Sequence, residues 1–191
     1  MVAVVLLKNS GVLPLKPGAK IAVVGPGGVT QTGMVGPYFG DDICYRPEES
    51  LKNRVYDCIP TIASQIAATN AGGTTTVAEG VGMSDSNSSG IAAALALVEA
   101  ADVVVMAIGF DHTMEHEGMD AVNISLPGLQ ESFALQVLAK KKATVLVLMG
   151  NDCNGIDKLI GDSAAIVRAF YPATHGAKAL ASLLFGKANR W

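Results

Sequence analysis

A short acidic segment brings together several side chains that could perform acid/base chemistry. Residues 109–120 read GFDHTMEHEGMD and contain four carboxylates and two imidazoles. This density is unusual because only 16% of the 191 residues are charged. Carboxylates and imidazoles transfer protons near neutral pH, so the segment indicates a site for general acid/base catalysis. The plain alternative is a solvated surface loop.

One local pattern in this segment suggests zinc. His112 to His116 spells HxxEH, which in one class of zinc peptidases places both imidazoles on one face of a helix. The motif needs a helix, but Gly109 ends an apolar run just before it and Gly118 follows it closely. Too little chain remains for that helix, so we expect no zinc site, no other metal and no cofactor.

The elements that would position this segment follow from periodicity, because short apolar runs alternate with helical spacing along the chain. The first expected strand begins at Ile21 and stops before the turn at Gly25. Further strands are expected at Thr74–Ala78, Asp102–Gly109, Thr144–Gly150 and Ala164–Tyr171. The expected helices cover Thr61–Asn70, Gly90–Ala101, Gly128–Lys142, Asp157–Ile160 and Ala173–Phe185. Residues 30–58 show no period and are expected to form a long loop.

This alternation predicts an α/β fold, a doubly wound three-layer sandwich with five to six mostly parallel strands. The length favours a single domain that covers residues 1–191. Ligands gather at the carboxyl ends of the strands in such sheets. That rule selects four segments for a site, residues 25–45, 109–120, 150–157 and 171–176.

Composition excludes several kinds of partner. A net charge of −3 without a basic run argues against nucleic acid. The apolar runs are interrupted within about ten residues, too short for a membrane span of about 18 to 20. Residues 1–7 lack a basic leader and a cleavage site, so we expect no signal peptide in them. Nucleotide binding at Gly25-Pro26-Gly27-Gly28 is a weak alternative, since this turn lacks the GxGxxG and GKS patterns.

The three cysteines leave two alternatives open. Cys44, Cys58 and Cys153 are an odd set without CxxC spacing, which argues against a zinc site or a redox dithiol. A disulfide between Cys44 and Cys58 is one alternative. The favoured interpretation is that the thiols are buried and act as small hydrophobic residues.

Several motifs occur in the order that one family shows. Residues 109–133, GFDHTMEHEGMDAVNISLPGLQESF, resemble the centre of the C-terminal domain of glycoside hydrolase family 3, particularly its β-xylosidase and α-arabinofuranosidase branch. Similar motifs of that domain are VLLKN at 5–9, IAVVGP at 21–26, GxYxG at 36–40, YP at 171–172 and LFG at 184–186. The resemblance therefore covers nearly the whole chain.

The resemblance also implies roles for single residues. Glu117 would be the general acid/base, because the acid/base glutamate of this family often stands immediately before G-x-D. Glu115 is the reserve candidate. The candidates for substrate binding are Asp111, His112, Asp120 and Tyr38, with the acidic loop helping to wall the terminal sugar.

A retaining glycosidase needs a second, nucleophilic carboxylate about 5 to 5.5 Å from the first. In this family it is an aspartate, commonly in an SDW-like motif of an N-terminal (β/α)8 barrel. The only tryptophan of this chain is Trp191, and no such motif occurs. The resemblance thus implies that the barrel is missing and that residues 1–20 would connect to it. It also implies that the isolated chain does not hydrolyse glycosides efficiently.

By resemblance, the expected activity is exo-acting hydrolysis of β-glycosides, with xylose- or arabinose-type substrates favoured over glucose. The expected partners are a carbohydrate and the barrel domain or other subunits, and the expected location is secreted or vacuolar. Some positions depart from the family pattern. Ala121 occupies a position where the family usually has arginine, and Ala173 follows Tyr171-Pro172 where the family motif Tyr-Pro-Gly has glycine. The alternative is therefore a non-catalytic structural or interaction module with the same fold.

Overall fold

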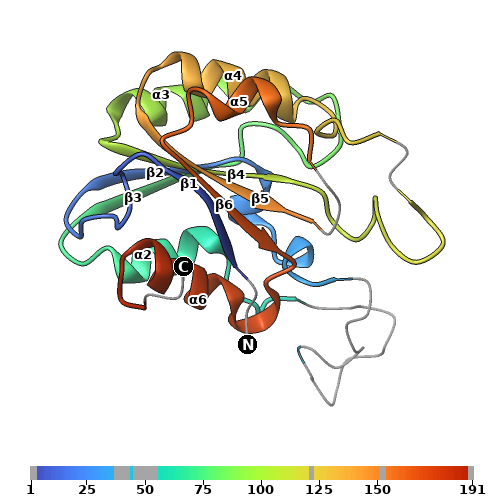
Figure 1. Cartoon of the computed structure of the whole chain (residues 1–191), viewed down its shortest axis with the longest axis horizontal. Coiled ribbons are helices and arrows are strands. Elements are labelled where there is room, and N and C mark those ends of the chain that lie inside the picture. Colours follow the sequence, from blue (N-terminus) through green and yellow to red (C-terminus); the bar gives the residue numbers. More distant parts are fainter. Residues whose placement is uncertain (1–3, 37–43, 45–55, 121–122, 151–153, 189–191) are drawn as a thin grey trace.

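A computed structural model describes residues 4–36, 44, 56–120, 123–150 and 154–188. A central six-stranded sheet lies between two layers of helices (Figure 1). The strands are β1 (Val5–Asn9), β2 (Lys20–Val24), β3 (Thr74–Ala78), β4 (Val103–Gly109), β5 (Ala143–Met149) and β6 (Ala165–Phe170). The helices are α1 (Pro26–Val29), α2 (Ile62–Thr69), α3 (Ile91–Ala100), α4 (Gln130–Ala139), α5 (Asp157–Ile160) and α6 (Ala173–Leu184). The predicted three-layer α/β sandwich is confirmed.

The strand order is β1-β6-β5-β4-β2-β3, and every pairing except that of β1 with β6 is parallel. The chain runs from β2 outward to β3 and then returns past β2 to β4, so the order of the sheet reverses between β2 and β4. Helices α3, α4 and α5 cover one face of the sheet, and α2 and α6 cover the other (Figure 1). This topology brings the ends of β2, β4, β5 and β6 to one edge.

The core consists of two apolar layers, one on each face of the sheet. In β4, Val105 and Ala107 pack in the layer of α2 and α6, whereas Val104, Met106 and Ile108 pack in that of α3 and α4. All five side chains are fully buried. Burial on both faces explains why these strands are continuous apolar runs in the sequence.

The amino-terminal segment contributes a strand. Residues 5–9, expected within a connecting extension, form β1 at the edge of the sheet, antiparallel to β6. Lys8 Nζ donates to the carbonyl oxygen of Ile160 over 2.7 Å, which ties β1 to the end of α5. Part of the segment 1–20 therefore belongs to the sheet itself.

The expected loop at residues 30–58 begins with regular structure. Thr32–Met34 forms a turn of 3-10 helix directly after α1. Pro26 at the start of α1 is compatible with a helix because the first turn needs no N–H donor there. The sequence did not predict α1 and the 3-10 turn, because glycine and proline are typical of loops.

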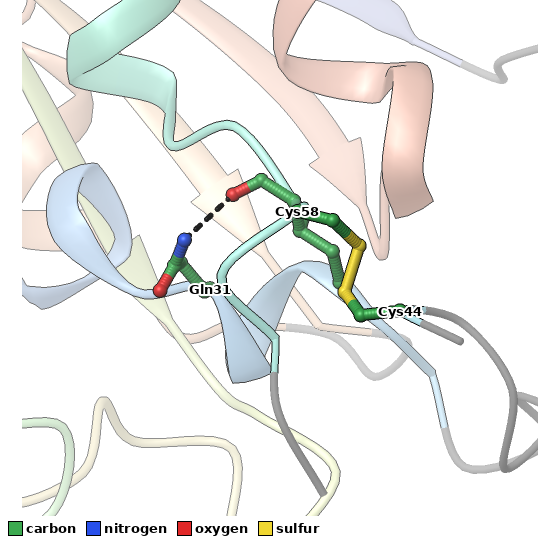
Figure 2. Close-up of a disulfide and its surroundings, with 4 residues drawn as sticks. Gln31, Cys44 and Cys58 are labelled. Carbon is green, nitrogen blue, oxygen red and sulfur yellow. Dashed lines mark hydrogen bonds between the residues drawn. A yellow bond between two sulfur atoms is a disulfide. The ribbon is translucent and has the colours of Figure 1, made fainter. Parts of the chain in front are cut away.

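Cys44 and Cys58 form a disulfide with a Cα–Cα distance of 5.6 Å (Figure 2). The favoured interpretation of buried thiols is therefore wrong for this pair, and Cys58 is an exposed residue. Beside the disulfide, Gln31 Nε2 donates to the carbonyl oxygen of Ile59 over 2.9 Å (Figure 2). The spacing of two cysteines does not determine their pairing, which depends on how the loop folds back. Cys153 lies outside the described residues.

Over the ranges that the structure describes, none of the helices has both the length and the apolar character needed to cross a membrane.

Candidate functional site

The four segments selected from the sequence meet around two side chains, Glu115 and Tyr171. The hydroxyl of Tyr171 donates to Glu115 Oε1 over 2.7 Å. A Cβ atom added to Gly150 would lie 2.8 Å from the same oxygen, so the carboxylate rests on the end of β5. A Cβ atom added to Gly36 would lie 3.3 Å from the Tyr171 ring. The predicted gathering of strand ends is confirmed for these residues.

The inner part of the acidic loop is a turn closed by Asp111. Its Oδ1 accepts hydrogen bonds from the backbone N–H of Thr113 over 2.9 Å and from the Thr113 hydroxyl over 2.5 Å. The backbone N–H groups of Met114 and Glu115 donate to the Asp111 carbonyl. This arrangement is typical of aspartate at a turn. HxxEH at residues 112–116 does not lie in a helix. Among the described residues, no group of three His, Cys, Asp or Glu side chains could hold a metal ion.

The outer part of the loop is a two-residue hairpin with Glu117 at its tip. His116 and Met119 exchange backbone hydrogen bonds of 3.1 and 2.8 Å. Gly118 adopts a φ of 83°, which glycine reaches without strain. His116 Nδ1 lies 2.7 Å from the Glu117 carbonyl oxygen, which closes the turn further. The Glu117 residue is exposed, and the loop that carries it, drawn in yellow, extends away from the sheet (Figure 1).

The root of the loop is held by Gln130, the first residue of α4. Its side chain is fully buried and pairs with both backbone groups of Gly109, accepting from N–H over 2.7 Å and donating to the carbonyl over 2.8 Å. The same amide donates to the Met83 carbonyl over 2.5 Å. Gln130 therefore fixes the point at which the acidic loop leaves β4. Gln130 lies within residues 109–133, which resemble the family, but that resemblance implied no role for it.

Arg168 holds the turn after β5. Its Nη2 donates to the Gly150 carbonyl over 2.9 Å and its Nη1 to Asn154 Oδ1 over 2.5 Å. The guanidinium lies 5.1 Å from the centroid of the Phe170 ring, within the range of a cation–π contact. Sequence reasoning missed Arg168, although an arginine within an apolar strand was the available signal.

The remaining candidates differ in their surroundings. Glu115 is only 3% exposed and Asp111 is 9% exposed, so both lie inside the loop. His112 is half-buried, and Asp120 is exposed near the foot of the hairpin. Tyr38 and Ala121 lie outside the described residues. The four carboxylates of the loop thus form a buried pair, Asp111 and Glu115, and an exposed pair, Glu117 and Asp120.

Two hollows lie elsewhere on the described surface. One of about 210 Å³ lies at the end of β3 and includes Glu79 and Asn87. The other, of about 230 Å³, lies between β3 and α3. Neither hollow includes a residue of the acidic loop.

The glycine turn after β2 is packed rather than open. A Cβ atom on Gly25 would lie 2.3 Å from the Ala107 carbonyl oxygen, and one on Gly27 would lie 2.6 Å from Met149 Sδ. Both glycines are buried against the neighbouring strands. These glycines serve close packing between α1 and the sheet, which argues against a phosphate site.

Comparison with known proteins identifies the family. The model described as "Glycosyl hydrolase family 3 C-terminal domain" matches residues 4–190. The chain belongs to glycoside hydrolase family 3. As a C-terminal domain of this family, it has the α/β fold that its motifs implied, and the resemblance found in the sequence is confirmed.

The relatives of this family 3 domain include fungal xylosidases. A probable exo-1,4-beta-xylosidase of Aspergillus niger is 33% identical over 97% of the chain, and one of Aspergillus fumigatus is 32% identical over 96%. The chain spans only 22% of the length of each relative.

Solved structures agree with this assignment. A GH3 exo-beta-xylosidase in complex with a xylobiose aziridine activity-based probe superimposes with a TM-score of 0.81 at 29% identity, over 96% of the chain and 22% of that protein. A beta-glucosidase from Listeria innocua gives 0.79 at 26% identity, over 96% of the chain and 23% of that protein.

Proposed function

We propose that this family 3 domain supplies the general acid/base carboxylate, Glu117, to an exo-acting β-glycosidase whose second domain is a (β/α)8 barrel. The observation that carries the proposal is the exposed position of Glu117 at the tip of a hairpin rooted in the sheet. A proton donor must come within hydrogen-bond reach of the glycosidic oxygen. An exposed carboxylate on an anchored hairpin meets that requirement when another domain faces it.

The chemistry divides between the two domains. Glu117 protonates the leaving oxygen in the first step and accepts a proton from water in the second. The barrel provides the nucleophilic carboxylate, which a retaining mechanism places about 5 to 5.5 Å away. The barrel also provides part of the wall around the terminal sugar, and the acidic loop at residues 109–120 provides another part.

The proposed substrates are β-xylosides, or arabinosides as the nearest alternative, in preference to glucosides. The support is that the two Aspergillus relatives, at 33% and 32% identity, are named as probable exo-1,4-beta-xylosidases, whereas the beta-glucosidase from Listeria innocua is 26% identical. Asp120 and His112 are the proposed sugar contacts of this domain, together with Tyr38. Asp111 is better suited to holding the loop, because Thr113 already donates twice to its Oδ1.

A secreted or vacuolar location is part of the proposal. Its support within the chain is the disulfide between Cys44 and Cys58, since disulfides persist in oxidising compartments.

The test uses a hybrid enzyme in which this chain replaces the matching 22% of the Aspergillus niger relative. Glu117→Gln removes the acidic proton but keeps the size of the side chain. We expect turnover of xylobiose to fall about 10²- to 10⁴-fold relative to the unmodified hybrid, the usual contribution of general acid/base catalysis. Glu79→Gln, at an exposed glutamate after β3, is the matched control and should leave turnover unchanged. Equal turnover in the Glu117→Gln and Glu79→Gln hybrids would remove Glu117 from the mechanism.

The second candidate is the non-catalytic module, favoured by Ala121 at the position where the family usually has arginine. A hybrid whose barrel remains intact but whose turnover is lost even with the unmodified chain would support that candidate.

A further inference from the structure

We propose that Glu115 is a positioning residue, whose contact with Tyr171 braces the hairpin that presents Glu117. This inference rests on the proposed function of Glu117 as the acid/base. The carboxylate of Glu115 accepts the Tyr171 hydroxyl over 2.7 Å, and the residue is 3% exposed. A buried hydrogen bond between segments 56 residues apart restrains both of them.

The hydrogen bond between Glu115 and Tyr171, which we call the brace, adjoins the base of the hairpin. Glu115 immediately precedes His116, the residue at which the hairpin begins. Its backbone N–H also donates to the Asp111 carbonyl over 3.3 Å, so the main chain and the side chain are both held. Movement of the hairpin relative to the sheet therefore requires the bond to Tyr171 to stretch or break.

The other half of the brace is fixed by the ends of three strands. Tyr171 follows β6, and its ring lies against Gly36 in the segment after β2. Gly150, at the end of β5, leaves the space that the Glu115 carboxylate fills, because a Cβ there would lie 2.8 Å from Oε1. Arg168 holds the Gly150 carbonyl in turn. The residues at the strand ends thus form a packing site that the Glu115 side chain fills.

The same geometry argues against Glu115 as the proton donor. A donor has to reach the glycosidic oxygen, but Glu115 is buried and its carboxylate is engaged at the strand ends. Two residues later, Glu117 is exposed at the tip. The structure therefore assigns the two glutamates separate tasks, with Glu115 acting through Glu117.

The first arm of the test measures amide hydrogen exchange in this chain alone, which does not depend on catalysis. Tyr171→Phe removes only the hydroxyl, and we expect the amides of His116 and Met119 to exchange about three- to tenfold faster. Glu115→Gln keeps an acceptor oxygen and should change these rates less than about twofold. Amides of β5 provide the internal control. Unchanged exchange at His116 and Met119 in Tyr171→Phe would overturn the brace.

The second arm compares two substrates in the hybrid enzyme. Cleavage of xylobiose needs protonation of the leaving oxygen, whereas 2,4-dinitrophenyl β-xyloside releases 2,4-dinitrophenolate, a stable anion that leaves without an acid. If Tyr171 positions Glu117, Tyr171→Phe should lower kcat/KM about tenfold for xylobiose, mainly through kcat, and less than about twofold for the dinitrophenyl substrate. A merely structural loss would lower both values equally, and that result would contradict the proposal.

Glu115→Gln decides between positioning and proton transfer. Because the amide oxygen still accepts from Tyr171, the variant should keep most of its activity on xylobiose, and Glu115→Ala should behave like Tyr171→Phe. A loss in Glu115→Gln as large as that in Glu117→Gln would make Glu115 the proton donor instead. If Glu117→Gln alone retains full turnover, the proposed function fails, and the exchange measurement still reports on the brace.

Discussion

Two glutamates two residues apart occupy opposite environments. Glu117 stands exposed at the hairpin tip, whereas Glu115 is buried against Gly150 and Tyr171. The G-x-D pattern after Glu117 made it the first candidate from the sequence. The burial of Glu115 could not be predicted, because its hydrogen-bond partner is 56 residues away and meets it only through the order of the strands.

Alanine substitutions at two glycines of this site distinguish the cost of a positive φ from the cost of a steric clash. Gly118 has a φ of 83° with nothing near its absent Cβ, so Gly118→Ala should cost about 1 kcal/mol of unfolding free energy. Gly150 has a φ of 99°, and a Cβ there would also lie 2.8 Å from Glu115 Oε1. Gly150→Ala should therefore cost about 2 to 4 kcal/mol. Urea unfolding of both variants measures the difference, and equal costs would show that Gly150 is not part of the packing site for the carboxylate.

At the scale of elements, the long buried strands and the amphipathic helices could be predicted because their patterns are local. The expected ranges of β3 and α5 match the structure, and β4 begins one residue later than expected. β1 was not expected to be a strand, since it is a short edge strand whose pairing partner, β6, comes about 160 residues later. α1 was missed because Pro26 and two glycines dominate its four residues.

The link between α4 and β4 is the contact between elements that most directly supports the acidic loop. Gln130→Leu keeps an apolar stem but removes the partner of the Gly109 and Met83 backbone groups. We expect a loss of about 2 to 4 kcal/mol in unfolding free energy, because these polar groups become unsatisfied in a buried place. Gln136→Leu, at an exposed position of the same helix, is the control and should change stability by less than about 0.5 kcal/mol. Similar losses in both variants, measured by urea unfolding, would contradict the anchoring role of Gln130.

At the scale of the whole molecule, the fold is a platform that holds one edge of strand ends rigid and extends a hairpin from it. The family and the fold class could be predicted because several motifs occur in register along the chain. The disulfide and the roles of Gln130 and Arg168 could not, because each depends on how distant segments pack. The chain spans 22% of its curated relatives, so the proposed reaction depends on surfaces beyond this domain.

The central claim is that Glu117 is the acid/base of the assembled enzyme, and azide tests it most directly. In Glu117→Ala, a glycosyl–enzyme formed from 2,4-dinitrophenyl β-xyloside lacks the base that activates water. Azide needs no base, so it attacks the anomeric carbon, releases the nucleophilic carboxylate and forms β-xylosyl azide with retained configuration. We predict faster turnover with azide and this product from the Glu117→Ala hybrid, and neither from Glu115→Ala. Formation of the azide by Glu115→Ala, with none from Glu117→Ala, would contradict the account.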